Sequence, residues 1–424
     1  MSYRRASWSL LAATLVAMLV AVAACSNPQP AAEPSPAPAT SVKLTADVPD
    51  GLAIGVVVSV TSAPSEGAQW RDAAQGAQVA ASRYAAGGTT ITLVPINDKG
   101  TAEGAKAAID TLADRGVAGI VVATSGSHLR DALQEAATRK IATLLPYATS
   151  ADGLPEHSWL TGAAAQVSNQ RLVEALQQQN LGRPYLINAG GGDIEGITPV
   201  GSRAFRAGED PDRLARKLAK SQRKNETSFD AVVITGPAEL QGRLVAALQG
   251  AGIETPMLLS SDALAPVFPV AITKAGGSLS GVFETAGLDV GDAAALQPSD
   301  AGRAAAAYYS AVSLLAAGPK ATDLLDQVPF SSIAGVADPR SHDAVVALVR
   351  AAAAANSTEP AAVAAALSGL KLGWSDGLAG PPLDFSAPVA VAPDAVRMLS
   401  ATPDSPGVRP ASAKTPALYW YPTT

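Results

Sequence analysis

Hydrophobic and polar residues follow two periods along most of the chain, and these periods predict strands and helices in turn. The segment Leu52-Ala-Ile-Gly-Val-Val-Val-Ser-Val is continuously apolar and rich in β-branched residues, which is typical of a strand buried on both faces. The next segment, 70–84, places small residues and Tyr84 on one side of a helix. Gly87 and Gly88 then predict the end of that helix.

The same alternation continues far along the chain. Further strands are expected at 90–96, 118–123, 141–145, 185–188, 229–235, 256–260 and 417–421. Further helices are expected at 102–115, 128–139, 166–179, 211–223, 240–249, 301–317, 342–355 and 360–370. Strands and helices that alternate across short loops predict an α/β protein with parallel, doubly wound sheets. Gly190-Gly191-Gly192 follows a strand, and we interpret it as a tight turn into a helix.

Length and composition narrow the picture further. The chain has 424 residues, more than the roughly 250–300 that a single hydrophobic core supports, so two lobes are expected. Hydrophobic residues make up 48% and charged residues 16%, as in a globular protein. A net charge of -6 disfavours nucleic acid as a partner.

The N-terminal residues have the order of an export signal. Arg4 and Arg5 precede an uncharged apolar run, and small residues lead up to Cys25, the single cysteine of the chain. The ending Val-Ala-Ala-Cys resembles the lipobox of bacterial lipoproteins, which implies cleavage after residue 24 and a diacylglycerol (palmitate-type) anchor on Cys25. An uncleaved membrane helix is the alternative, although the run is short of the roughly 20 residues of a span. Residues 25–46, dense in Pro and Ala, predict a stiff tether that holds the folded body on the extracytoplasmic face of the cell membrane.

Signatures of enzymes and cofactor sites are missing from the sequence. The spacing G-x-S-x-G occurs at Gly373-Trp-Ser-Asp-Gly, but it follows an expected helix and not a strand, so it does not form a nucleophile elbow. There is no G-x-x-x-x-G-K-[ST] phosphate loop. The glycines at 190–192 lack dinucleotide spacing because position 195 is Glu. His128, His157 and His342 lie far apart, without metal-ligand spacing. We therefore expect no catalytic residue, no metal and no cofactor.

One loop has the chemistry of a binding site. Thr124-Ser125-Gly126-Ser127 ends an expected strand and opens an expected helix. Hydroxyls and free N–H groups at such a place suit a carboxylate, and open sheets bind ligands at the carboxyl ends of their strands. The alternative is simple N-capping of the helix by Ser127.

Several motifs together resemble type I periplasmic binding proteins, and in particular the branched-chain amino acid (leucine/isoleucine/valine) binding proteins of ABC transporters. The motifs that carry the likeness are Ile54-Gly-Val-Val-Val-Ser-Val-Thr-Ser, Gly76-Ala-Gln-Val-Ala-Ala, Asn97-Asp-Lys-Gly, Gly119-Ile-Val-Val-Ala-Thr-Ser-Gly-Ser, Pro146-Tyr-Ala-Thr, Phe229-Asp-Ala-Val, Ser341-His-Asp-Ala and Gly380-Pro-Pro-Leu-Asp-Phe. The resemblance implies two doubly wound parallel-sheet lobes joined by a hinge, with the ligand between them. The implied first lobe is 47–160 plus 285–375, and the implied second lobe is 161–284 plus 376–424.

The resemblance also implies roles for single residues. Thr149 matches a threonine that meets the amino and carboxyl groups of an amino acid, and Tyr147 matches a position that contributes backbone groups. Asp262 matches an acidic residue of the second lobe that pairs with the ligand ammonium; a helix N-cap is the alternative. Trp70 lies near the first loop, where it could either line the cleft or simply pack in the protein interior. Residues 236–238 lack the aromatic residue that often covers the ligand, so the identity of the ligand stays open.

The expected function is that of a lipid-anchored solute-binding protein. It would capture a small polar ligand such as an amino acid and deliver it to an ABC permease. The alternative is a sensor or scaffold lipoprotein of the same fold that acts on a membrane or cell-envelope partner.

Overall fold

The computed structural model describes residues 41–63, 66–224, 228–410 and 415–423. Cys25, the expected signal segment and most of the expected tether lie outside these residues, whereas the described part belongs to one compact unit. Within that described part, no helix has the length and apolar character needed to cross a membrane.

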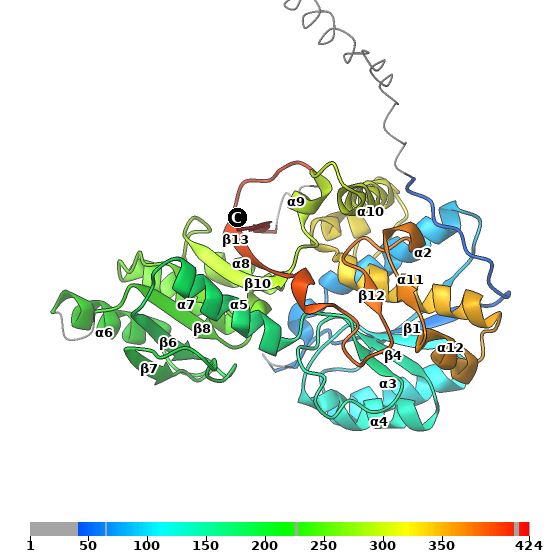
Figure 1. Cartoon of the computed structure of the whole chain (residues 1–424), viewed down its shortest axis with the longest axis horizontal. Helices are drawn as coiled ribbons and strands as arrows, with labels where there is room; N and C mark the ends of the chain where they lie inside the picture. Colours follow the sequence, from blue (N-terminus) through cyan, green and yellow to red (C-terminus); the bar gives the residue numbers. More distant parts are fainter. Residues whose placement is uncertain (1–40, 64–65, 225–227, 411–414, 424) are drawn as a thin grey trace, which may run out of the picture. The chain divides into compact units, whose positions relative to one another are not determined.

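A five-stranded sheet forms the centre of the first lobe (Figure 1). Its strand order is β2-β1-β3-β4-β5, and all neighbouring pairs are parallel. The bounds are β1 Ala53–Val58, β2 Thr92–Asn97, β3 Gly119–Val122, β4 Ala142–Leu145 and β5 Ser158–Leu160. Its helices are α2 Gly76–Ala86, α3 Ala102–Asp114, α4 Arg130–Thr138, α10 Asp300–Ala316, α11 Pro339–Ala355 and α12 Pro360–Leu367.

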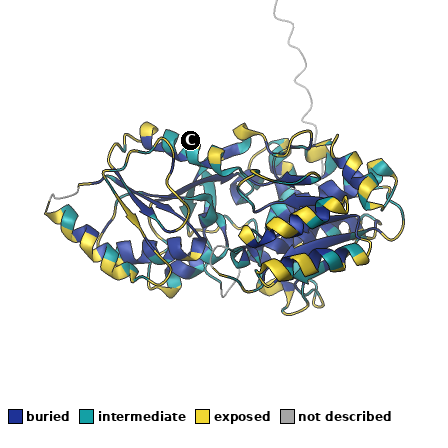
Figure 2. Ribbon diagram, turned by 90° about the horizontal axis from the view of Figure 1, so that it is seen from below, coloured by how far each residue is buried: buried dark blue, intermediate teal, exposed yellow. Residues whose placement is uncertain are grey.

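Both faces of this sheet are covered. Val57 and Ile120 share a buried cluster with residues of α3 and α4, whereas Val56 and Val121 belong to a second cluster with residues of α2, α11 and α12. Successive residues of a strand point to opposite faces, so a strand buried on both sides must be apolar throughout. The inner strands β1, β3 and β4 are almost fully buried, and Figure 2 shows exposed residues on the outer sides of the helices.

A seven-stranded sheet forms the centre of the second lobe, in the order β14-β13-β10-β9-β8-β6-β7. The bounds are β6 Pro184–Asn188, β7 Gly201–Ala204, β8 Ala231–Thr235, β9 Met257–Leu259, β10 Phe283–Leu288, β13 Val396–Thr402 and β14 Tyr419–Pro422. Strands β6 to β10 run parallel, and β13 and β14 are added antiparallel. Its helices are α5 Ala165–Gln178, α6 Pro211–Arg223, α7 Ala238–Gly250 and α8 Val267–Lys274.

Short elements complete the fold. The small ribbon pairs β11 Lys371–Leu372 with β12 Leu383–Asp384, and α9 Asp292–Ala295 follows β10. Single 3-10 turns are η1 Ala68–Trp70, η2 Ala73–Gln75, η3 Ser127–Leu129, η4 Ser261–Leu264, η5 Phe330–Ser332, η6 Ala334–Val336, η7 Trp374–Asp376 and η8 Pro393–Ala395. The two lobes with parallel sheets confirm the expected fold class.

Two local predictions are wrong. The expected helix 70–84 is broken into η1, η2 and α2, so Trp70 lies in a turn and not in the helix. The glycines at 190–192 do not open a helix, because the chain continues through a loop into β7, which pairs with β6. The side chain of Asn188 accepts hydrogen bonds from the N–H groups of Gly190 (3.0 Å) and Gly192 (3.1 Å), which satisfies the loop without a helix.

Candidate functional site

Three loops of the first lobe meet at the carboxyl ends of their strands, where open parallel sheets bind ligands. They follow β1, β3 and β4. Two residues of the second lobe reach the same place: Asp262 of η4, and Ala238 at the first position of α7. The candidate site therefore takes groups from both lobes.

The loop after β3 holds a carboxylate that belongs to the chain itself. Ser127 Oγ donates to Glu66 Oε1 (2.9 Å), and the backbone N–H of His128 donates to Glu66 Oε2 (3.1 Å). Gly126 has a φ of 139°, and a Cβ on it would lie 2.9 Å from the Glu66 Cα, so the close approach of the two loops requires glycine at that position. Ser127 does not cap the following helical turn, whose N-cap is Gly126, so the capping alternative is wrong.

His128 lies between two carboxylates. Its Nδ1 is 2.6 Å from Glu66 Oε2, and its Nε2 is 2.9 Å from Asp98 Oδ2. Burial lowers the pKa of His128, but the hydrogen bonds and charges of Asp98 and Glu66 outweigh it, so the pKa is raised. Burial also raises the pKa of Glu66, and the hydrogen bonds from His128 and Ser127 reverse that effect and lower it. A protonated imidazole donates from both nitrogens and so holds Glu66 in place.

Gln69 connects the two lobes. Its Nε2 donates to Asp262 Oδ1 (2.6 Å), and its Oε1 accepts the backbone N–H of Ala238 (3.0 Å). Burial raises the pKa of Asp262 to about 6, opposed by the hydrogen bond from Gln69. The Asp262 side chain caps neither η4 nor α8, whose N-caps are Ser260 and Pro266, so the capping alternative is wrong here as well.

Trp70 and Tyr147 form a stacked pair beside these contacts. Their ring centroids are 4.7 Å apart with an interplanar angle of 4°. The guanidinium carbon of Arg340 lies 4.9 Å from the Trp70 ring and 4.8 Å from the Tyr147 ring, and Arg340 is paired with Asp338 (2.7 Å). Trp70 is 2% exposed, so it packs in the core and lines a cavity at once.

That cavity is small. Trp70, Tyr147, Thr149 and Arg340 line it, with a volume of about 10 Å³. A cavity of this size holds about one water molecule. In this conformation it does not hold the head group of an amino acid.

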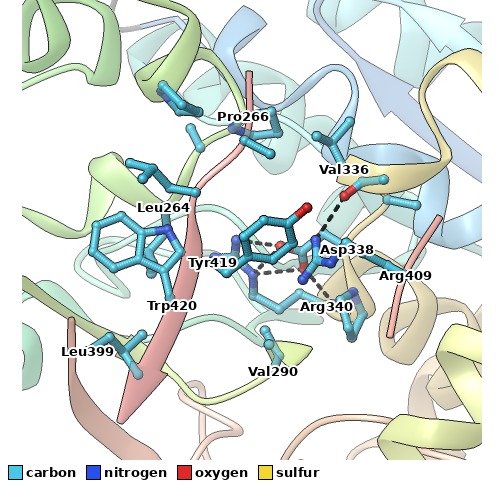
Figure 3. A pocket seen from close by; sticks show the side chains of 18 of the residues that line it. Leu264, Pro266, Val290, Val336, Asp338, Arg340, Leu399, Arg409, Tyr419 and Trp420 are labelled. Atoms are coloured by element: carbon cyan, nitrogen blue, oxygen red, sulfur yellow. Dashed lines mark hydrogen bonds and ion pairs between the residues drawn. The ribbon is translucent and has the colours of Figure 1, made fainter. Parts of the chain in front are cut away.

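A larger cavity adjoins it and shares Arg340, Leu264 and Leu288 as walls. Its volume is about 90 Å³, and its lining comes from both lobes and from the crossover after β10. Figure 3 shows Asp338, Arg340 and Arg409 gathered on one side of this cavity, with Leu264, Leu399 and Trp420 on the opposite side.

The structure brings part of the predicted set together. Trp70, Tyr147 and Thr149 share one cavity, whereas Ser127 and Asp262 contact Glu66 and Gln69 of the same chain. Ser125 packs beside Gly67, since a Cβ on that glycine would lie 2.7 Å from the Ser125 nitrogen. Ligand binding by the predicted residues stays a prediction. In the described part of the chain, no group of three or more potential ligating side chains could hold a metal ion.

Glu66, Gln69 and Arg340 were not predicted as site residues. Glu66 and Gln69 lie in the irregular segment after β1, where no periodicity or motif of the sequence pointed to them. At positions 236–238, where the family's covering aromatic is missing, the chain instead offers the N–H of Ala238 to Gln69.

Comparison with known proteins supports the fold. The model of a family described as periplasmic binding proteins and sugar binding domain of LacI family matches residues 51–189. No curated protein sequence matches the chain.

Solved structures match over most of the chain. The branched-chain amino acid transporter substrate binding protein LivJ from Streptococcus pneumoniae, in complex with isoleucine, superposes with a TM-score of 0.63 at 17% identity, covering 88% of this chain and 99% of that one. The leucine binding protein LivK from Thermotoga maritima gives a TM-score of 0.59 at 16% identity, over 87% of this chain and 97% of that one. A fatty acid ABC transporter substrate-binding protein from Thermomonospora curvata gives a TM-score of 0.59 at 17% identity, over 90% of this chain and 93% of that one.

Proposed function

We propose that this chain, which has the type I periplasmic binding protein fold, is an extracytoplasmic solute-binding protein that captures a small ligand between its lobes for an ABC importer. The observation that carries the proposal is the place of the candidate site. Polar and aromatic groups from three strand ends of one lobe meet Asp262 and Ala238 of the other. A ligand that contacts both lobes binds the closed state more tightly than the open state. It therefore shifts the equilibrium between open and closed molecules toward the closed state.

An amino acid is one candidate ligand. Its carboxylate would take the donors of the 125–128 loop, and Tyr147 and Thr149 would flank it. Its ammonium would meet Asp262. This mode requires that Glu66 and Gln69 leave these partners, since both now occupy them. Two solved structures of the same fold are complexes with isoleucine or leucine.

The test of this function is ligand-dependent uptake. Thermal-shift screening of the purified chain against amino acids, amides and short peptides should identify a stabilising ligand. Cells that lack the chain should then lose high-affinity uptake of that ligand, labelled isotopically. Uptake that stays unchanged without the chain would contradict the importer role.

The second candidate function is a sensor or scaffold of the same fold. The link between the lobes through Gln69 favours it, because the protein itself supplies contacts that a ligand makes in a transport protein. A chain that alters the activity of a membrane partner while binding no transported solute would support this candidate.

Membrane attachment through Cys25 is part of the proposal and rests on the sequence, because Cys25 lies outside the described residues. We expect Cys25→Ser to release the protein from the membrane fraction or to block its processing. Two acyl chains hold a protein firmly, at about 0.8 kcal/mol per buried methylene. Retention of a correctly cleaved Cys25→Ser protein in the membrane fraction would contradict the lipid anchor.

A further inference from the structure

Ligands of this fold that carry an amino acid head group need a place for a carboxylate and a place for an ammonium. Here both places are filled from one loop of the chain. The Glu66 carboxylate takes the donors of Ser127 and His128, and the Gln69 amide donates to Asp262. The volume that remains beside Trp70 and Tyr147 is about 10 Å³. A ligand that leaves this arrangement intact has to lie elsewhere.

The adjoining cavity has the necessary room. With a volume of about 90 Å³, and about 10–15 Å³ per water-sized unit, it holds roughly six to nine non-hydrogen atoms. Much of its wall is apolar, with Leu264, Val290, Leu399 and Trp420 among the lining residues. Its size and walls suit a short branched hydrocarbon.

Two arginines line this cavity, and each already has its counter-charge. Arg340 is paired with Asp338. Arg409 forms an ion pair with Asp292, and it also donates to the Gly335 carbonyl (2.9 Å) and to the Tyr309 hydroxyl (3.1 Å). The charge of each arginine is therefore compensated within the protein, although the buried Nε of Arg409 has no hydrogen-bond partner.

Asp289 is the exception among the acidic groups. It lines the cavity directly after β10, and its buried Oδ1 has no hydrogen-bond partner. Burial raises its pKa, opposed by a backbone hydrogen bond from Gly291 and by the charge of the exposed Arg397. Burying a carboxylate oxygen without a partner is costly, so this oxygen needs a partner such as a ligand, an ion or a water molecule.

We propose that this cavity is a binding site for a small primary amine with a short apolar body, whose ammonium pairs with Asp289. The proposal rests on the proposed solute-binding function and names the ligand class. The ligand carries no carboxylate, because Asp338 and Asp292 already compensate the two arginine charges at the cavity. Binding across Leu264 of the second lobe, Val336 of the first and the crossover at 289–291 would hold the two lobes together.

Three probes that share the leucine side chain separate the possibilities. They are 3-methylbutylamine, which lacks the carboxylate of leucine, 4-methylpentanoate, which lacks its amine, and leucine itself. Isothermal titration into the full chain, at equal detergent, should show binding of 3-methylbutylamine at least tenfold tighter than binding of the other two. Tighter binding of leucine or of 4-methylpentanoate overturns the proposal, as does the absence of amine binding up to 10 mM.

Two matched variants locate the amine. Asp289→Asn should weaken binding of 3-methylbutylamine at least tenfold, and its melting temperature should stay equal to that of the wild type or rise, because an unpartnered charge is removed. Asp131→Asn, a matched change at an exposed carboxylate of α4, should leave the affinity within about twofold. If Asp262→Asn weakens binding tenfold and Asp289→Asn does not, the ammonium lies at Asp262 and the proposal is overturned. That result would leave the solute-binding function standing.

A cavity-filling variant tests whether the amine occupies the cavity itself, independently of the change at Asp289. Val336→Phe places a larger side chain in the cavity wall while the Gln69–Asp262 contact is untouched. It should abolish amine binding in a protein that still melts cooperatively. Unchanged binding by this variant overturns the proposal.

Discussion

Replacing Gln69 by Ala tests whether one side chain holds the lobes together. The change removes two hydrogen bonds that cross between lobes, to Asp262 and to the N–H of Ala238. A hydrogen bond to a charged group contributes about 1.5–3 kcal/mol and a neutral one about 0.5–1.5 kcal/mol. The closed state should lose about 2–4.5 kcal/mol, which shifts the ratio of open to closed molecules by at least about thirtyfold.

Spin-label distances measure this shift directly. Lys106 of α3 and Arg213 of α6 are exposed and belong to different lobes, so cysteines at these positions report the separation of the lobes. Cys25, the single native cysteine, is replaced by Ser to make the labelling specific. At pH 8 the Asp262 carboxyl, with its pKa of about 6, is ionised. We expect Gln69→Ala to broaden the distances and move them to larger values.

A matched variant exists within one lobe. Gln179 donates to Glu284 Oε2 (2.7 Å), the same pairing of amide and carboxylate, but both residues belong to the second lobe. Gln179→Ala should change the stability of that lobe and leave the spin-label distances as in the wild type. If the distance distributions of both Gln69→Ala and Gln179→Ala match that of the wild type, Gln69 does not hold the lobes closed.

Two further predictions concern the loops of the candidate site. The pKa of His128 is raised in the folded protein. Its contribution to stability is therefore present below the unfolded pKa of about 6.5 and is lost as the pH rises through the folded pKa. Glu66→Gln should flatten the resulting fall in melting temperature between pH 6 and 9, and an unchanged dependence of melting temperature on pH would contradict the role of Glu66. Gly67 and Gly88 both have positive φ, 91° and 90°, but a Cβ on Gly67 would lie 1.8 Å from Thr124 Oγ1 and one on Gly88 meets nothing within 4 Å. Chemical denaturation should show that Gly88→Ala lowers the free energy of unfolding by about 1–2 kcal/mol, from the backbone conformation alone. Gly67→Ala should lower it by about 1–3 kcal/mol more, because the added Cβ overlaps its neighbours. Equal losses for the two variants would refute the reasoning.

The sequence predicts best the strands that are buried on both faces. β1, β3 and β8 are buried on both faces, so their continuous β-branched runs are visible in the sequence. β13 was not predicted, because it mixes buried, intermediate and exposed residues and lies in a Pro-rich segment. Its pairing with β10 and β14 defines it as a strand, and such pairing depends on residues far away in the sequence.

The same limit applies to the site. Position at a strand end predicted the 125–127 loop, and the structure places polar contacts there. Glu66 could not be predicted in the same way, because its contact with Ser127 spans 61 residues and joins two irregular loops. No periodicity determines the path of such loops. The site is therefore predicted where regular elements end and missed where irregular segments meet.

The connection between distant segments also determines when the molecule can fold. The face of the first sheet that carries α2 is closed by α11, and Gly76 of α2 approaches Asp338 so closely that a Cβ would lie 1.9 Å from its carbonyl oxygen. The second sheet pairs β10 with β13, more than a hundred residues later. Neither core is complete until residues near 350 and near 400 are present, and closing loops of this length is entropically costly and slow. A chain that emerges gradually therefore stays unfolded for most of its synthesis, which would suit the proposed export of this protein in an unfolded state.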